Sequence, residues 1–169
     1  MSTCKWCNNR GIFLFTDKDG LCQKCSFKIR TEANSKLRVI KESEKLIEKT
    51  KKIDTVISSS ELMIQYLSDF LKYEEKGISV FSRSIKDTIE GCCNETDDKI
   101  YSLLYPEYQK NIEKIDQLKS LNAKVNQANK FKSTTDKITA YLEKRHFKNT
   151  TLSQELVTMN KDLLDLTVI

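Results

Sequence analysis

The sequence holds few residues that interrupt helices, with four Gly and one Pro among 169 residues. It is also poor in hydrophobic residues, which make up 38% of the chain, whereas charged residues make up 31%. Long helices that each bury one apolar stripe suit this composition better than a compact mixed fold, because most of their surface faces water. We therefore expect a mainly α protein.

Long apolar runs are absent as well. No stretch of about eighteen apolar residues exists, as a membrane-spanning helix would need, and the first residues lack the apolar core of a secretory signal. We therefore expect a cytoplasmic protein with no membrane partner. In that compartment the six cysteines stay reduced, which favours metal binding over disulfides.

The common motifs of enzyme chemistry are also missing: there is no phosphate-binding glycine loop, no nucleophile elbow and no HExxH pattern. The single histidine, His146, has no catalytic motif around it, so we interpret it as a surface or packing residue. The carboxylate pairs Glu74–Glu75 and Asp97–Asp98 lie on polar stretches that we expect to be exposed. The chain is therefore predicted not to be an enzyme.

The net charge of +5 is distributed unevenly. Residues 1–52 hold thirteen basic and six acidic residues, whereas residues 53–98 hold four basic and ten acidic ones. A basic segment attracts phosphate groups, an anionic lipid surface or an acidic protein, and it can equally dock on the acidic segment of a second copy.

Four cysteines form two closely spaced pairs, C-x2-C-x14-C-x2-C, at Cys4, Cys7, Cys22 and Cys25. Two intervening residues let both sulfurs of a pair face one ion, and four thiolates complete the tetrahedral shell of zinc without leaving a position for water. The pattern predicts one structural Zn²⁺ on these four residues. An iron site with the same ligands is the alternative.

Between the two pairs, Ile12–Thr16 is a short apolar run and Asp17–Gly20 is typical of a turn, which together predict a short β-hairpin. After the second pair, the apolar residues recur at intervals of three and four, which indicates helix.

Residues 4–30 resemble small Cys4 zinc modules of the treble-clef or zinc-ribbon type. In a treble clef the second cysteine pair lies at the start of a helix, as the pattern here indicates, with Phe27 and Ile29 placed to pack on the hairpin. Such knuckles often carry Gly after their second cysteine, where this chain has Asn8, the next best residue for a left-handed backbone. The resemblance implies a module that binds protein, binds nucleic acid or stabilises a terminus, and so does not determine the function.

The rest of the chain is predicted to form an elongated helical domain over residues 31–169, after the zinc module of residues 1–30. Two long runs of similar length favour an antiparallel helical hairpin or coiled coil, with a last helix as a third member of the bundle. Ser58–Ser60 and Pro106 are the expected weak points. The expected elements are a helix over about 27–76, a connector over 77–95, a helix over about 97–146 and a C-terminal helix over about 152–166.

We interpret the chain as an adaptor or regulator that presents its zinc module and helical rod to a protein partner. The alternative is a nucleic-acid-binding protein that uses the basic zinc module. Residues 1–30 hold six basic and two acidic residues, fewer cations than a dedicated nucleic-acid binder uses, so protein interaction is favoured. The candidate contact residues for either partner are Trp6, Arg10, Lys24, Lys28 and Arg30.

Two further expectations concern association and the remaining cysteines. A helical hairpin leaves apolar flanks uncovered, so we expect a homodimer rather than a monomer. Cys92 and Cys93 are adjacent, which makes them a poor chelate for one tetrahedral ion, and we interpret them as a partly buried pair in the connector.

Overall fold

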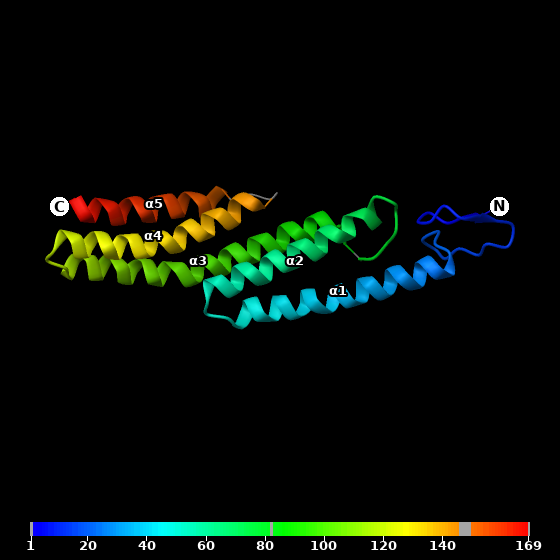
Figure 1. Ribbon diagram of the computed structural model, residues 1–169, viewed down its shortest axis with the longest axis horizontal. Helices are drawn as coiled ribbons and strands as arrows, with labels where there is room; N and C mark the ends of the chain where they lie inside the picture. Colours follow the sequence, from blue (N-terminus) through cyan, green and yellow to red (C-terminus); the bar gives the residue numbers. More distant parts are fainter. Residues whose placement is uncertain (1, 82, 146–149, 169) are drawn as a thin grey trace. The chain divides into compact units, whose positions relative to one another are not determined.

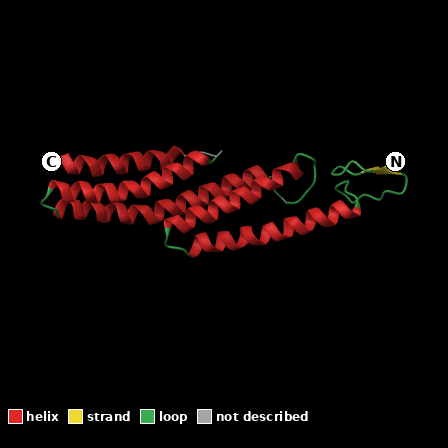
Figure 2. Ribbon diagram, viewed as in Figure 1, coloured by secondary structure: helices red, strands yellow, loops and turns green. Residues whose placement is uncertain are grey.

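The computed structural model describes residues 2–81, 83–145 and 150–168, and helices account for 77% of them (Figure 2). The predicted mainly α class is therefore confirmed. Two short strands, β1 (Ser2–Thr3) and β2 (Arg10–Gly11), pair in antiparallel fashion near the N-terminus. The helices, labelled in Figure 1, are α1 (Gln23–Lys49), α2 (Ile53–Glu74), α3 (Ile85–Gln117), α4 (Leu121–Lys144) and α5 (Thr150–Val168).

The chain divides into two compact units. The first consists of Met1–Leu46 and Ser59–Cys92, and the second consists of Ile47–Ser58 and Cys93–Ile169. The predicted zinc module of residues 1–30 lies entirely within the first unit. It shares α1 with the helical part, because that helix begins at Gln23, between the cysteines of the second pair.

In the first unit, α1 and α2 contact each other through charged and aromatic side chains, and both bury part of the apolar stripes that the sequence indicates. Ion pairs flank this contact: Lys36 Nζ lies 2.6 Å from Asp69 Oδ2 and 3.0 Å from Glu32 Oε1, and it also lies over the Phe70 ring. The side chains buried in this unit include Ile29, Ala33 and Ile40 of α1 and Met63, Leu67 and Phe70 of α2.

The helix predicted over residues 27–76 is interrupted at Thr50–Lys52, not at the expected weak point Ser58–Ser60. The Thr50 hydroxyl accepts the N–H of Lys52, and such a local hydrogen bond competes with the helical ladder. Ser59 and Ser60 are buried inside α2 instead. Their small side chains therefore occupy a packed position on the helix rather than a break in it.

In the second unit, α4 and α5 lie side by side (Figure 1). Thr135 Oγ1 of α4 and Asn160 Oδ1 of α5 are joined by a hydrogen bond of 2.9 Å. Tyr108 of α3 contacts both partners, because its ring lies 5.9 Å from that of Phe131 and its hydroxyl donates to Asp162 Oδ2 at 2.7 Å. This unit buries Leu104 and Ile115 of α3, Phe131 and Ile138 of α4, and Leu156 and Leu163 of α5.

The helix predicted over residues 97–146 is also divided, into α3 and α4. The break comes before Leu121, whereas Pro106 lies inside α3. Pro106 and Ser102 are both exposed, so water can satisfy the carbonyl that loses its partner to the missing proline N–H. The predicted connector over 77–95 is shorter than expected, because α3 begins at Ile85, where Ser84 accepts the N–H of Asp87.

The last helix, predicted over about 152–166, extends over Thr150–Val168. The interpretation of His146 lies outside the described residues. Within the described part of the chain, no helix combines the length and apolar character needed to cross a membrane.

Candidate metal centre

The first cysteine pair lies on a tight knuckle between β1 and β2. The Cys4 N–H donates to the Asn9 carbonyl at 3.0 Å, and the Asn8 N–H donates to the Cys4 carbonyl at 2.9 Å. Asn8 has a φ of 58°, in the left-handed region that Asn enters at lower cost than most residues. The left-handed position expected after Cys7 is therefore confirmed.

The second cysteine pair follows a turn at Asp17–Gly20. The Gly20 N–H donates to the Asp17 carbonyl at 2.9 Å, and Gly20 has a φ of 76°, which glycine adopts without steric cost. The Cys22 carbonyl then accepts the N–H of Ser26 in the first turn of α1. The predicted turn is confirmed, and Cys25 sits at the start of a helix, as expected.

The strand predicted over Ile12–Thr16 is wrong except at its end, where Thr16 forms one bridge with Cys22. The chain leaves β2 at Gly11 and turns at once, with the Leu14 N–H directed at the Gly11 carbonyl, so the run has no partner strand. As a result, Phe13 and Phe15 are each 87% exposed.

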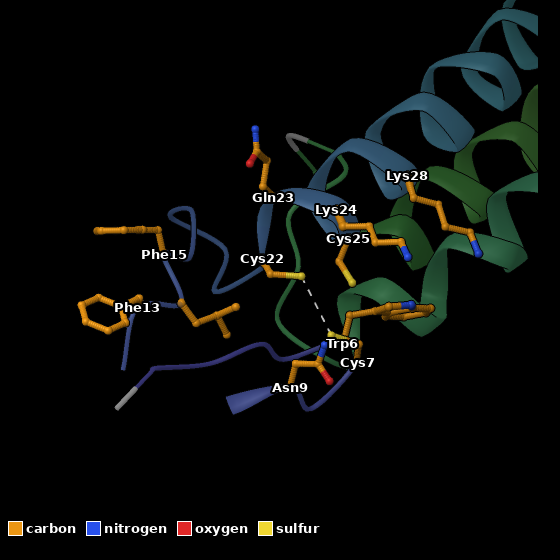
Figure 3. Close-up of a pocket in the computed structure, with 11 residues that line it drawn as sticks. Trp6, Cys7, Asn9, Phe13, Phe15, Cys22, Gln23, Lys24, Cys25 and Lys28 are labelled. Carbon is orange, nitrogen blue, oxygen red and sulfur yellow. Dashed lines mark hydrogen bonds between the residues drawn. The ribbon is translucent and has the colours of Figure 1, made fainter. Parts of the chain in front are cut away.

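The two knuckles bring the thiols of Cys4, Cys7, Cys22 and Cys25 together, with all four sulfurs within 4.8 Å of one another. Cys7 Sγ and Cys22 Sγ are 3.9 Å apart, the contact dashed in Figure 3. Tetrahedral zinc bound at about 2.3 Å to each sulfur requires sulfurs about 3.8 Å apart. The donor atoms and their spacing therefore fit one metal ion, with Cys7 exposed and the other three cysteines buried.

The environment of the sulfurs favours unequal protonation. Burial opposes ionisation of Cys4, but N–H donors, led by that of Cys22 at 3.3 Å, lower the pKa of this thiol to about 6. Burial, hydrogen bonds to the neighbouring sulfurs and the charge of Cys4 raise the pKa of Cys25 to about 12. A metal ion that binds all four thiolates must therefore displace protons, and its affinity depends on pH.

Asp17 joins the turn to α1. Its Oδ1 accepts the N–H groups of Asp19 and Leu21, both at 3.0 Å, and its Oδ2 accepts the Ser26 hydroxyl at 2.6 Å. Although burial opposes ionisation of Asp17, these donors and Arg30 lower the pKa of the carboxyl to about 2. Sequence reasoning treated Asp17 only as a turn residue, although the spacing of Ser26 and Arg30 on one helix face pointed to a shared partner.

The candidate contact residues lie in different surroundings. Arg30 is engaged with the turn, since its Nη2 lies 2.8 Å from Asp19 Oδ2 and 3.2 Å from Asp17 Oδ2. Arg10 is exposed on β2. Lys24 and Lys28 line one cavity of about 610 Å³ together with Trp6.

Trp6 attaches the first knuckle to α2. Its ring centroid lies 5.1 Å from that of Tyr73, and Lys76 Nζ lies 4.7 Å from the Trp6 centroid. Trp6, a candidate contact residue from the sequence, is half-buried against the end of α2.

Sequence reasoning missed the aromatic wall of the same cavity, formed by Phe13 and Phe15. Figure 3 shows these rings to one side of the cysteines and Lys24 and Lys28 to the other. Phe27, which was predicted to pack on the hairpin, is 75% exposed, whereas Ile29 is buried as predicted. The sequence carried no signal for this exposure, because only the fold shows that the run has no partner strand apart from the single bridge at Thr16.

The expectation that Asp97 is exposed is wrong. Its Oδ2 lies 2.9 Å from Nη2 of Arg145, and both side chains are almost fully buried. Arg145 Nη1 also donates to the Cys93 carbonyl at 3.5 Å. Cys92 and Cys93 are both buried, but the prediction that they lie in the connector is wrong, because both belong to α3.

Comparisons of this chain with protein-family models, with curated proteins and with solved structures find no match.

Proposed function

We propose that this chain is a non-catalytic zinc-binding interaction protein, an adaptor or regulator whose zinc module of treble-clef type contacts a partner protein. One observation carries the proposal: Phe13, Phe15 and Phe27, which we name the phenylalanine patch, are exposed beside the four-thiol cluster. Clustered exposed apolar side chains on a water-soluble surface mark interaction sites. Binding of the partner would bury these rings.

The four cysteines support a structural metal rather than a catalytic one. Four thiolates fill the tetrahedral shell of Zn²⁺, so no position remains for a substrate or a reactive water. When bound, zinc would cross-link the two knuckles. Cys7 and Cys22 enclose the fourteen residues that carry Phe13 and Phe15, and closing this loop before binding lowers the entropy lost when the partner docks.

Nucleic acid is the second candidate, because Lys24 and Lys28 line the same cavity as the aromatic rings of Phe13 and Phe15. Rings can stack on bases while lysines neutralise phosphates. Two features weigh against it: Arg30 is already paired with carboxylates, and the exposed Ile12 is aliphatic and has no ring to stack. Protein interaction therefore remains the better supported function.

The test is purification of the tagged full chain from its native cell after nuclease treatment. We expect a stoichiometric protein partner that is lost when Phe13→Ser and Phe15→Ser are combined. Val157→Ser with Leu164→Ser is the matched control, because these apolar residues are exposed on α5. The proposal fails if no protein depends on the patch and the chain instead binds DNA or RNA at micromolar affinity in about 150 mM salt.

A further inference from the structure

We propose that the phenylalanine patch binds a short segment of the partner protein in which apolar side chains are flanked by Asp or Glu. This inference rests on the proposed function and names the chemistry of the partner. Shape, charge and the kind of exposed side chain lead to it separately.

The shape of the surface is concave on both sides of Phe15. One side is the cavity of about 610 Å³ that Phe13, Lys24 and Lys28 also line. The other is a cavity of about 670 Å³ that Phe27 also lines, and Gln23 belongs to both. Two adjoining hollows that share Phe15 and Gln23 suit the alternating side chains of a peptide better than a flat membrane surface.

The charges on this surface that no opposite charge compensates are positive. Among the described residues, no carboxylate pairs with Lys24 or Lys28, and both side chains are exposed. The acidic group in the second cavity, Asp17, is already neutralised by Arg30 at 3.2 Å. A bound segment therefore meets two uncompensated ammonium groups beside apolar walls, and acidic residues next to its apolar anchors would complement them.

The kind of exposed side chain favours protein over nucleic acid. Ile12 is 75% exposed next to the patch, and Leu14 lines the first cavity with Phe13. Aliphatic groups gain from contact with other apolar side chains but offer nothing to a base that stacks on rings. Two lysines also neutralise few phosphates, so they would hold a nucleic acid only weakly.

The experiment selects binders from a displayed library of random peptides about twelve residues long, which reach about 40 Å when extended, on the zinc-loaded full chain. Peptides that also bind the Phe13→Ser, Phe15→Ser variant are removed first. We expect the enriched sequences to combine apolar anchors with a net negative charge. Unchanged zinc content and Trp6 fluorescence show that each variant is folded.

An enriched peptide is then synthesised and its affinity measured by fluorescence anisotropy. We expect at least about tenfold weaker binding for Phe13→Ser with Phe15→Ser, because two buried rings are lost. Lys24→Glu with Lys28→Glu should weaken binding by a similar factor and flatten its salt dependence. The controls Val157→Ser with Leu164→Ser and Lys110→Glu with Lys130→Glu should change affinity by less than about twofold.

The other outcomes separate the two proposals. If the enriched peptides bind through the patch but are neutral or basic, the inference of an acidic partner is wrong and the proposed function still stands. If the chain self-associates in sedimentation and the association needs the patch, a second copy occupies this surface, and the inference of an acidic partner is again wrong. If no peptide needs the patch, the inference is wrong, and if an oligo(dT) strand or phosphatidylserine vesicles bind through the patch instead, the proposed function is wrong as well.

Discussion

The N-terminal module of residues 2–30, which carries the four-cysteine cluster, differs from the three helices α3, α4 and α5 in what can stabilise its fold. In the module, Leu21 and Ile29 are the buried aliphatic residues beside the cysteines, and three phenylalanines remain exposed. The helices of the second unit each bury several apolar residues, among them Leu104 of α3, Ile138 of α4 and Leu156 of α5. A segment too small to build a core needs a metal, whereas long amphipathic helices stabilise one another by burial.

The largest effect should follow from breaking the metal site. We expect one zinc per chain, lost in Cys22→Ser, because structural zinc contributes about 10–16 kcal/mol to modules of this kind. Residues 2–30 should then lose protection in hydrogen exchange, while α4 and α5 keep theirs. Cys92→Ser, outside the cluster, should retain the metal, and freshly purified reduced protein without bound metal would contradict the prediction.

Asp97→Ala tests what stabilises the helices of the second unit. Removing this carboxylate leaves the buried Arg145 guanidinium without its ion pair, and such a change costs about 3–5 kcal/mol. Urea unfolding followed by far-UV circular dichroism measures the loss. Asp98→Ala, at the exposed neighbouring position, should cost less than about 0.5 kcal/mol. Zinc content should stay unchanged in both variants, and a change in it would mean that the two regions are not stabilised separately.

The Asp17 network should give a smaller, pH-dependent effect. The pKa of Asp17 is lowered from 3.8 to about 2, so its carboxylate stabilises the folded chain above about pH 4, and this stabilisation is lost as the pH falls through 2. At pH 7 the depression corresponds to about 2 kcal/mol. The difference in unfolding free energy between the natural chain and Asp17→Asn should be constant down to about pH 4 and then shrink. A constant difference below that pH would refute the role of the charge.

The smallest effect should come from Trp6→Ala, which removes the contacts of the module with Tyr73 and Lys76. An aromatic pair and a cation–π contact together contribute about 1–2 kcal/mol. Hydrogen exchange around Cys4 and Cys7 should therefore quicken while the zinc stays bound. Loss of the zinc would show that Trp6 supports the metal site itself and not only its attachment to α2.

Local chemistry explains why part of the structure could be predicted. Cysteine spacing, the left-handed Asn8 and the turn at Asp17–Gly20 depend on a few neighbouring residues, so the pattern of residue types is enough. The helix break at Thr50–Lys52 could not be predicted, because three serines at Ser58–Ser60 form the weaker helical stretch by propensity. Burial of Ser59 and Ser60 against neighbouring side chains overrides that propensity. The coiled coil, the elongated shape and the homodimer stay predictions, which scattering and sedimentation can check.

The sequence by itself determined the mainly α class and which four cysteines form a cluster able to hold a metal ion, since periodicity and cysteine spacing are properties of short segments. Only the tertiary structure decided which of the remaining side chains are covered. Asp97 became buried because Arg145, 48 residues away in the chain, lies beside it. Phe13 and Phe15 became exposed because no strand or helix of the described chain packs on their loop. Whether a side chain is buried depends on the residues, often distant in the sequence, that pack on it. Periodicity does not indicate which residues these are.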